Sequence, residues 1–493
     1  MEQSINYKHK IDFLVSDNMD HKKCNVCKIR KNIRNRLSEN KVIDNFIMYT
    51  QRSIEPGGEL EFVYYDNFKN IEFIAEGGFS KIYKATWAGG PINKWLRTEN
   101  DKKLLNIPSR INNYTVVLKK LNDSKNITSK ELNELKVFYQ IYSDSDVSKL
   151  NINQYFGITQ DPITGDYMII MPYYKSGDMT HFISNDFYNI SWENRLNKLR
   201  HIIIGLTHIH KLKIIHRDLH SGNIFIGEYF AYIGDLGISK SATESTDNTN
   251  ENYGIIPYMA PEIFQGQKYT EASDIYSFGM IMWEFTNGRR PFWDRNHDTE
   301  LIIDISDGLR PPIVTNAPEG FIELMEDCWH SDPKKRPTAI DILKKIEEMW
   351  KNELENYYYR NPTKIIKSSD IGPVAKNNPG AIYKSRPLSR MIHSAMSLRS
   401  SRSRSINTNL ETDPFYYYQE NNIASTDKRK FEDDSVEDSN DDSQNIIKRR
   451  KLFKTKNSDY ITKEIEIDIN INLNQPRNNE YITKEFDIDI NNL

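Results

Sequence analysis

Apolar positions follow two different periods within residues 62–350. In the first part, short β-branched and aromatic runs are typical of strands. Strands are expected around Phe73, Tyr83, Val117 and Ile169, and one amphipathic helix is expected from about Leu132 to Tyr142. After about residue 176, apolar residues recur at every third and fourth position, for example over residues 196–210 and 275–285. Helices should therefore dominate the later part.

The composition changes after about residue 352, where Ser, Arg, Asn and Asp predominate. Such stretches bury too little apolar surface to offset the entropy lost on ordering. We therefore predict a basic leader over residues 1–67, a folded region over residues 68–350, and a low-complexity, mostly disordered tail over residues 351–493.

The tail contains an internal repeat, Tyr-Ile-Thr-Lys-Glu-(Ile/Phe)-(Glu/Asp)-Ile-Asp-Ile-Asn, at residues 460–470 and 481–491. Its apolar and acidic residues alternate with the two-residue period of a strand. A strand of this kind can add to the sheet edge of a partner protein, so the repeats are candidates for partner binding. The alternative is a disordered, duplicated tail.

Net charge and cysteine content exclude several classes of protein. The 493 residues carry a formal net charge of -3, which does not indicate a nucleic-acid-binding protein. Basic clusters at residues 428–430 and 448–451 leave a nuclear-import signal as an alternative to a solvated tail. Three cysteines are too few for a disulfide framework, and no run of about 18 apolar residues occurs. We expect an intracellular, cytoplasmic protein without a membrane segment, and nuclear localisation is the alternative.

Cys24 and Cys27 are spaced as one half of a zinc site. A structural zinc site needs four ligands, and no second pair follows. The third cysteine, Cys328, lies far along the chain, so a basic leader without zinc is the favoured interpretation.

A glycine-containing turn between two predicted strands is the first candidate for phosphate binding. Glycine allows backbone N–H groups to close over phosphates, although a plain hairpin turn would look the same. The candidate nucleotide-binding residues here are Ile74, Ala75, Glu76, Gly77, Gly78, Phe79, Ser80 and Ile82. Ala75 and Ser80 replace the first and third glycines of the G-x-G-x-x-G pattern.

Lys119 lies within an apolar strand, next to the candidate nucleotide contact Val117. A charge in this position is costly unless it is paired. Glu134 in the following helix can reach the ammonium group and orient it toward the α- and β-phosphates. Glu131 is the competing partner, and a solvated lysine is the bland alternative.

Residues 215–224, Ile-His-Arg-Asp-Leu-His-Ser-Gly-Asn-Ile, form the most specific motif. They place Asp218, which His216 and Arg217 precede, five residues before Asn223 in a loop that follows a helix. Asp218 can accept a hydroxyl proton, and Asn223 can bind Mg²⁺. Asp235, in a Gly-Asp-Leu-Gly turn after a strand, is the second metal ligand, since hard oxygen ligands suit Mg²⁺.

In this order, the motifs of residues 68–350 resemble a eukaryotic protein kinase domain. The resemblance implies an α+β, two-lobed fold, with a small five-stranded antiparallel sheet and one helix in one lobe and mainly helices in the other. It also implies ATP and Mg²⁺ as ligands and proteins as substrates. Met171 would be the gatekeeper, with Pro172 and Tyr174 contacting adenine, and Asp274 would brace the catalytic loop. Glu262 would pair with Arg336.

The segments Trp283-Glu284, Gly308–Pro312 and Cys328-Trp329 resemble the tyrosine-kinase-like group, whose members mostly act on serine and threonine. The sequences of the glycine turn and of the catalytic loop are similar to those of the expanded kinase families of mycorrhizal fungi. Two positions depart from serine/threonine kinases, with His220 in place of a lysine and Ile255 in place of a threonine. A dual-specificity or tyrosine kinase and a pseudokinase scaffold are therefore the alternatives.

His220 motivates one hypothesis about chemistry. Its imidazole would contact the γ-phosphate in the protonated form, given an ordinary pKa of about 6.5. The alternative is a solvent-facing histidine. The hydroxyl-rich residues 239–253 are a candidate regulatory loop, on which a phosphate would pair with Arg217.

Overall fold

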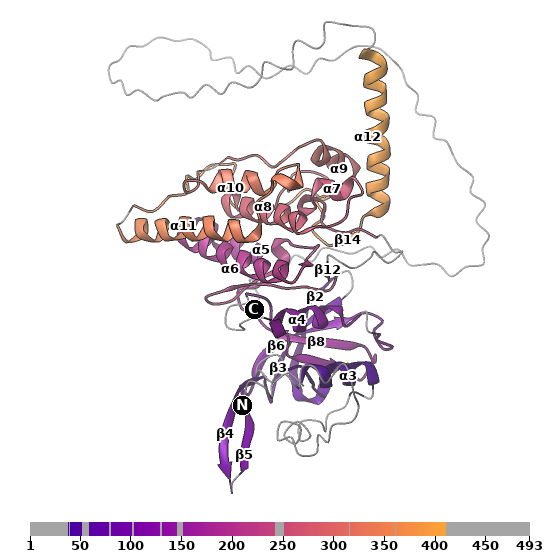
Figure 1. The fold of residues 1–493 in the computed structure, drawn as a ribbon, viewed down its shortest axis with the longest axis vertical. Coiled ribbons are helices and arrows are strands. Elements are labelled where there is room, and N and C mark those ends of the chain that lie inside the picture. Colours follow the sequence, from indigo (N-terminus) through magenta and orange to yellow (C-terminus); the bar gives the residue numbers. More distant parts are fainter. Residues whose placement is uncertain are drawn as a thin grey trace, which may run out of the picture. The chain divides into compact units, whose positions relative to one another are not determined.

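The computed structural model describes residues 38, 40–51, 59–77, 80–100, 103–128, 131–144, 151–241, 251–314, 316–359 and 361–410. Side chains of residues 93–108, 241 and 403–410 are not described. The pair Cys24 and Cys27, the basic clusters and the duplicated repeats lie outside these ranges. Figure 1 shows a sheet with helices α3 and α4 in one lobe and helices α5 to α11 in the other.

The first lobe is built on a six-stranded sheet in the order β1-β7-β8-β6-β3-β2. The strands are β1 (Glu61–Phe62), β2 (Phe68–Glu76), β3 (Ser80–Trp87), β6 (Tyr114–Leu121), β7 (Gly157–Gln160) and β8 (Tyr167–Pro172). Neighbours pair antiparallel except β1 and β7, which are parallel. We expected five antiparallel strands, and the sheet has a sixth, the short parallel edge strand β1. Its two residues are too few to show the alternation that predicts a strand.

Two helices, rather than the single one expected, accompany this sheet. Helix α4 (Asn133–Asp144) is the predicted one, and α3 (Lys41–Thr50) is an addition from the predicted leader. The Asn40 side chain caps the start of α3, and Ile43 and Ile47 bury its apolar face in the main core. The folded unit thus begins earlier than residue 68.

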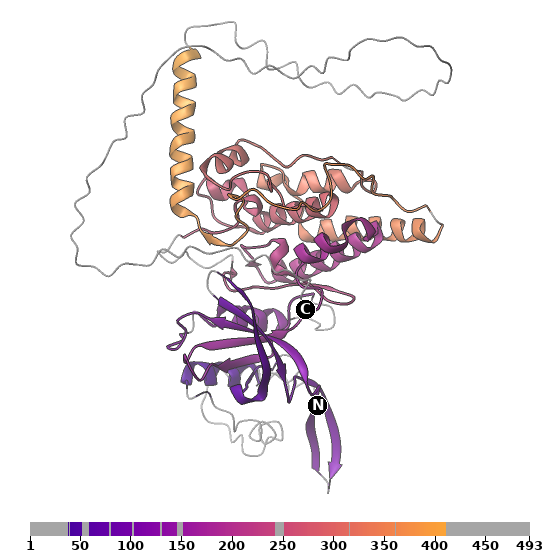
Figure 2. The ribbon, with the colours of Figure 1, turned by 180° about the vertical axis from the view of Figure 1, so that it is seen from behind.

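A hairpin of β4 (Ile92–Asn100) and β5 (Lys103–Arg110) is inserted between β3 and β6. It pairs only with itself and projects away from the six-stranded sheet (Figure 2). Arg110 at its base donates to both carboxylate oxygens of Glu61, at 2.9 and 2.6 Å, and this ion pair anchors the insertion to β1.

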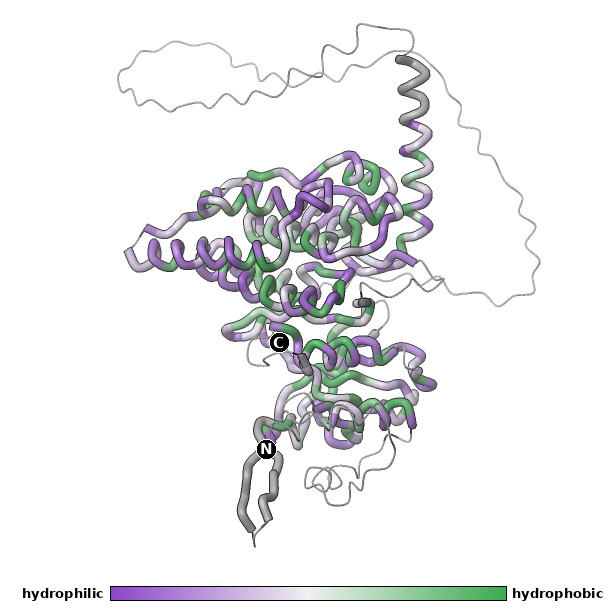
Figure 3. Tube along the Cα trace, in the orientation of Figure 1, coloured by the Kyte–Doolittle hydropathy of each residue, from purple (hydrophilic) through white to green (hydrophobic). Residues whose placement is uncertain are grey.

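The second lobe consists mainly of helices. They are α5 (Met179–Asp186), α6 (Trp192–Lys211), α7 (Pro261–Phe264), α8 (Glu271–Asn287), α9 (Thr299–Ser306), α10 (Phe321–Cys328) and α11 (Ala339–Tyr358). Helix α8 is buried along nearly its whole length at the centre of the lobe, whereas hydrophilic residues predominate along α11 (Figure 3). The predicted α+β class and its order, sheet first and helices later, are confirmed.

Short strands connect these helices around the site. They are β9 (Ile214–Ile215), β10 (Ile224–Ile226), β11 (Ala231–Ile233), β12 (Lys240–Ser241) and β13 (Tyr253–Gly254). Strand β10 pairs with β11, and β12 pairs with β9. The pairing of β9 with β12 holds the ends of the segment that contains Asp218, Asn223 and Asp235.

Residues 361–410 differ from the disorder expected after residue 350. This segment, which we call the C-terminal strap, crosses the helical lobe, forms strand β14 (Arg386–Pro387) and continues into α12 (Ser389–Leu410). Backbone contacts hold it, because Arg289 donates to the carbonyls of Ser369 and Gly372 and Tyr188 donates to that of Ile371. Ile371 and Ala381 are buried at isolated positions, and Leu388, Ile392 and Ala395 are buried with helical spacing, none of which composition alone reveals.

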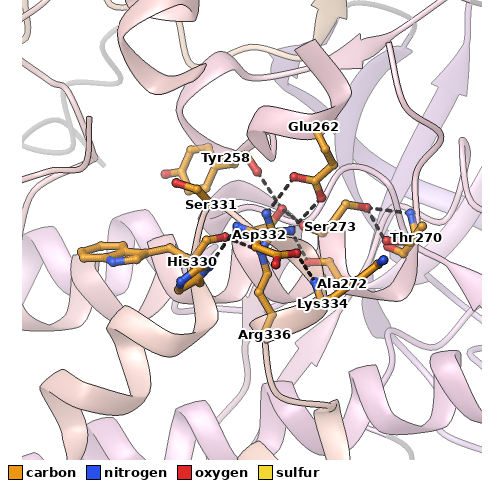
Figure 4. Close-up of polar contacts among 12 residues, drawn as sticks. Tyr258, Glu262, Thr270, Ala272, Ser273, His330, Ser331, Asp332, Lys334 and Arg336 are labelled. Carbon is orange, nitrogen blue, oxygen red and sulfur yellow. Dashed lines mark hydrogen bonds and ion pairs between the residues drawn. The ribbon is translucent and has the colours of Figure 1, made fainter. Parts of the chain in front are cut away.

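Arg336 joins three parts of the helical lobe (Figure 4). Its guanidinium donates to both oxygens of Glu262 at 2.7 Å, as the resemblance implied, and to the carbonyls of Ala272 and His330 at 2.8 Å. The Arg336 side chain has no exposed surface. Every contact is therefore made inside the lobe, where an unpaired charge would be costly.

Replacing Glu262 by Gln should destabilise the protein by about 3–5 kcal/mol, because it leaves the buried Arg336 charge uncompensated. Urea denaturation measures this change in the free energy of unfolding. As a control, Lys345→Met removes the exposed pair of Lys345 and Asp327, and should cost about 1 kcal/mol or less. Equal losses in the two variants would contradict the assigned role of Arg336.

Candidate active site

Lys119 owes its position to the alternation of β6. Val116, Leu118 and Lys120 point to one face of the sheet, so Lys119 points to the other, toward α4. Its ammonium donates to Glu134 Oε2 and to Asp235 Oδ1, both at 2.9 Å. The pairing expected between Lys119 and Glu134 is therefore present.

Glu131, the competing partner, is engaged elsewhere. Its carboxylate accepts hydrogen bonds from the backbone N–H and the hydroxyl of Thr128. Glu134 is instead fixed from its far side by the hydroxyl of Tyr155, which donates to Oε1 at 2.8 Å. The geometry leaves Glu134 as the carboxylate of α4 that holds Lys119.

Electrostatics keep Lys119 and Asp235 charged, whereas burial raises the pKa of Glu134. Burial alone would lower the pKa of Lys119, but the carboxylates of Asp235 and Glu134 outweigh that effect and raise it. Burial likewise favours a higher pKa for Asp235, yet the neighbouring ammonium lowers it overall. Lys119 is therefore a fixed positive charge and Asp235 a fixed negative one at neutral pH.

The loop after β9 is held by one buried carboxylate, Asp274 of α8. Its oxygens accept hydrogen bonds from the backbone N–H groups of His216 at 2.8 Å and Arg217 at 2.9 Å, and from His210 Nε2 at 2.9 Å. Arg217 has a φ of 73°, a region that residues other than glycine rarely adopt. Asp274 thus pins the turn that leads to Asp218, as the resemblance implied.

Hydrogen bonds also tie together the two candidate metal-binding stretches. His216 Nε2 donates to the Gly234 carbonyl at 3.0 Å, and the Asp218 N–H donates to His216 Nδ1 at 3.3 Å. The Asn223 side-chain amide donates to the Asp218 carbonyl at 2.9 Å. Asp218, Asn223 and the strand end before Asp235 therefore form one connected unit.

The Asp218 carboxyl is a weaker acid than an ordinary aspartic acid. Burial, followed by the nearby charge of Asp235, raises its pKa to about 6. The side chain of Ser385, from the C-terminal strap, lies beside this carboxyl and partly offsets the increase in its pKa. A carboxylate with a pKa near neutrality suits a group that accepts a proton.

His220 does not fit the hypothesis of a protonated phosphate contact. Burial lowers its pKa to about 4, and its Nδ1 accepts a hydrogen bond from the Gly222 N–H at 3.1 Å. A ring nitrogen that accepts a hydrogen bond carries no proton. The imidazole is therefore neutral and structural, and it is not the solvent-facing alternative either.

Polar groups around Ser221, the residue after His220, form a buried network. The Thr180 hydroxyl donates to Ser221 Oγ at 3.0 Å, and Ser221 also contacts the Tyr258 hydroxyl at 3.2 Å. Tyr258 donates to Glu284 at 2.7 Å, and burial raises the Glu284 pKa to about 8. Ile255, at the position where serine/threonine kinases carry a threonine, is buried as an apolar residue.

The glycine-containing turn lies between β2 and β3. The Gly77 N–H donates to the Ser80 carbonyl at 2.6 Å, and Ala75 is paired with Ile82 across the two strands. Ile74 and Glu76 lie on β2, while Gly78 and Phe79 lie outside the described residues. Strands β2 and β3 pair antiparallel on either side of this turn, and Ile82 of β3 lies opposite Lys119 of β6.

The expected hinge begins within β8, whose last two residues are Met171 and Pro172. Met171 is buried and pairs with Val117 across the sheet, and Pro172 pairs with Val116. The Tyr174 ring stacks on Phe225 of β10, with centroids 5.6 Å apart and planes 8° apart. The hinge is thus joined by an aromatic contact to the strand that directly follows Asn223.

Asn223 and Asp235 are suited to holding Mg²⁺. Asp235 is ionised, and 42% of its side-chain surface is exposed despite its contact with Lys119. The Asn223 NH₂ group is used by the Asp218 carbonyl, which leaves its side-chain oxygen as the metal-binding atom. Two hard oxygen ligands suit a Mg²⁺ ion that shares its remaining coordination with phosphates and water.

The sequence motifs missed three supporting residues. Tyr155 holds Glu134, and Phe225 packs on the hinge residue Tyr174. The Asn133 side chain donates to the carbonyls of Gly237 and Ser239, both at 3.0 Å, and so fixes the chain after Asp235. None of these lies in a recognisable pattern, although Asn133 directly precedes Glu134.

The regulatory loop is only partly described. Residues 242–250 lie outside the described ranges, so a phosphate on this loop stays a hypothesis. Arg217, its expected partner, stacks on the Tyr269 ring at 4.5 Å, and its Nε is buried without a hydrogen-bond partner among the described residues.

The fold and site define a protein kinase domain, and comparison with known families agrees. A profile of the family "Protein tyrosine and serine/threonine kinase" matches residues 68–346, more than half of the chain. The chain belongs to this protein kinase family. Within the described residues, no helix is both long and apolar enough to cross a membrane.

Several named proteins are similar to part of this chain. Stress-activated protein kinase alpha of Dictyostelium discoideum is 27% identical over 318 residues, 62% of this chain and 44% of the relative. A second Dictyostelium discoideum protein, named as a probable serine/threonine-protein kinase, is 27% identical over 317 residues, 61% of this chain and 16% of the relative. An Acanthamoeba polyphaga mimivirus protein, whose name describes a serine/threonine-protein kinase/receptor, is 32% identical over 181 residues, 36% of this chain and 11% of the relative. The chain thus spans less than half the length of each of these relatives.

Activity should rise with pH, with a midpoint near 6, because Asp218 accepts a proton only when ionised and its pKa is raised to about 6. The measurement is kcat/KM for a peptide substrate between pH 5 and 8. His220→Asn keeps a hydrogen-bond acceptor for Gly222 and should leave the midpoint unchanged, since the pKa of His220 is lowered to about 4. A midpoint that moves in His220→Asn would restore the protonated-histidine hypothesis.

Proposed function

We propose that this protein transfers the γ-phosphate of ATP to serine or threonine hydroxyls of proteins. The observation that carries the proposal is the joint placement of Lys119, Glu134 and Asp235 beside the loop that presents Asp218 and Asn223. Phosphoryl transfer needs held phosphates, a metal site and an aligned hydroxyl more than covalent help from the protein. Each need is matched by one part of this arrangement.

Lys119, oriented by Glu134, contacts the α- and β-phosphates, while the turn at Gly77 covers them. Asn223 and Asp235 hold Mg²⁺, which neutralises charge that develops on the phosphates. Asp218 orients the acceptor hydroxyl and takes its proton. The adenine lies at the hinge of Met171, Pro172 and Tyr174.

Specificity for serine and threonine is proposed from two lines of support. The names of the similar proteins describe serine/threonine kinases. In addition, the residues around Asp218 lack the Ala-Ala-Arg or Arg-Ala-Ala sequence of tyrosine kinases.

Membership of the tyrosine-kinase-like group is also a proposal. The Trp283 indole N–H donates to the Pro312 carbonyl at 2.9 Å, so two of that group's motifs pack together. Similarity to the kinases of mycorrhizal fungi, partner binding through the C-terminal repeats and a cytoplasmic location remain hypotheses from sequence.

Asp218→Asn should reduce phosphoryl transfer by about 10²–10⁴-fold, because it removes the proton acceptor. The measurement is the transfer of labelled phosphate from Mg-ATP to myelin basic protein, with phosphoamino acid analysis. Asp123→Asn, on an exposed turn whose φ of 54° asparagine tolerates, is the matched control and should keep full activity.

Phosphoserine or phosphothreonine that depends on Asp218 supports the proposal. Phosphotyrosine would favour the tyrosine or dual-specificity alternative. Bound ATP without any transfer would favour the pseudokinase scaffold.

A further inference from the structure

The C-terminal strap enters the active site between residues 381 and 389. Strand β14 pairs antiparallel with β13, with Arg386 opposite Gly254 and Pro387 opposite Tyr253. The pairing continues as the Leu388 N–H donates to the Asn252 carbonyl at 2.8 Å and the Asn252 N–H donates to Ser389 Oγ at 2.7 Å. The strap therefore lies as an added strand along the chain that leads into the catalytic lobe's Tyr258–Glu262 segment.

Ser385 is the strap residue that meets the catalytic machinery. Its side chain lies beside the Asp218 carboxyl, the group proposed to accept a proton from the substrate, and lowers the pKa of that carboxyl. The preceding residue, Lys384, donates from its ammonium to the Glu76 carbonyl, next to the glycine turn, at 3.4 Å. Lys384 and Ser385 thus bring the strap against both the glycine turn and Asp218.

Side chains on both sides fix this register. The Tyr383 hydroxyl donates to the Pro291 carbonyl at 2.9 Å, and the Arg290 guanidinium lies 3.9 Å from the centre of its ring. Beyond Ser385, Arg386 donates to the His297 carbonyl at 2.9 Å, and Leu388 is 1% exposed. A shift by one residue would remove Ser385 from Asp218 and expose Leu388, so the packing selects this serine.

We propose that residues 381–389 bind as an intramolecular protein substrate and that Ser385 is a phosphorylation site of this kinase. In the reaction, Ser385 Oγ forms a bond to the γ-phosphorus of ATP while the bond from that phosphorus to the β,γ-bridging oxygen breaks. ADP leaves, and the hydroxyl proton passes to Asp218 and then to water. The inference rests on the proposed function and adds a substrate to it.

The strap also indicates a substrate class and a competition. A preferred acceptor would be a serine with basic residues directly on both sides and proline two residues after it, as in Lys384-Ser385-Arg386-Pro387. While the strap is bound, other proteins must displace it, and its effective concentration is in the millimolar range, since it is tethered. Phosphate on Ser385 places negative charge beside Asp218 and Asp235, which favours release of the strap.

The first test follows phosphatase-treated full-length protein with labelled Mg-ATP and maps the labelled peptide. Ser385 should be labelled in wild type, but not in Ser385→Ala or Asp218→Asn, whereas Ser394→Ala, at an exposed position on α12, should change nothing. The fraction labelled per minute should not depend on enzyme concentration over a tenfold range. A rate that rises in proportion to concentration would mean transfer between copies and would overturn the proposal.

The second test compares one substitution at two leucines of the strap. Leu388→Asp should expel the strap and raise kcat/KM for myelin basic protein by about tenfold, because the tethered competitor is lost. Leu398→Asp, at a residue that is 47% exposed on α12, should leave kcat/KM unchanged. Hydrogen exchange in Asp218→Asn should show a protected backbone amide at Leu388, which donates to the Asn252 carbonyl, and added Leu388→Asp should abolish the protection at residue 388.

The two proposals fail in different ways. Label on myelin basic protein with Ser385 unlabelled would overturn the intramolecular substrate and leave the kinase intact. No label on any protein, in wild type or in Leu388→Asp, would overturn the kinase function itself.

Discussion

The rest of the site depends on one interaction, the pairing of the buried Lys119 ammonium on β6 with the carboxylates of Glu134 and Asp235. Lys119 is 11% exposed, and it can stay charged in this position only with carboxylates beside it. Glu134 comes from α4, and Asp235 comes from the end of β11, so the one requirement ties the sheet, its helix and the metal-binding turn together. Tyr155 and Asn133 add the hydrogen bonds that keep these two carboxylates in place.

The need to pair buried charges also organises the helical lobe. Asp274 is buried and takes its hydrogen bonds from backbone N–H groups of the catalytic loop, while the fully buried Arg336 takes its contacts from Glu262 and two carbonyls. Each buried charge is satisfied by chain segments far apart in sequence. Such contacts define one arrangement of loops, because any other would leave a charge unpaired at a cost of several kcal/mol.

Elements that the sequence predicts are set by local patterns along the chain, whereas those it does not predict are set by tertiary contacts. The β-branched and aromatic runs of β6 and β8 and the apolar spacing of α6 and α8 are local, and they predicted these elements correctly. The two-residue strand β1 carries no period, and its pairing with β7 is set by tertiary contacts. His220 was misread because a histidine's pKa depends on its burial, which spacing along the chain does not reveal.

The strap shows most clearly why composition misleads. Its Ser-, Arg- and Asn-rich residues lack the apolar period of a packed element, yet backbone hydrogen bonds to Asn252 and buried contacts at Leu388 hold it. A substrate must bind through such a mode, since a kinase has to accept extended chains that carry no fold of their own. A segment that looks disordered by composition is therefore suited to lie in the substrate position, and tethering compensates for the weak contacts that each residue makes.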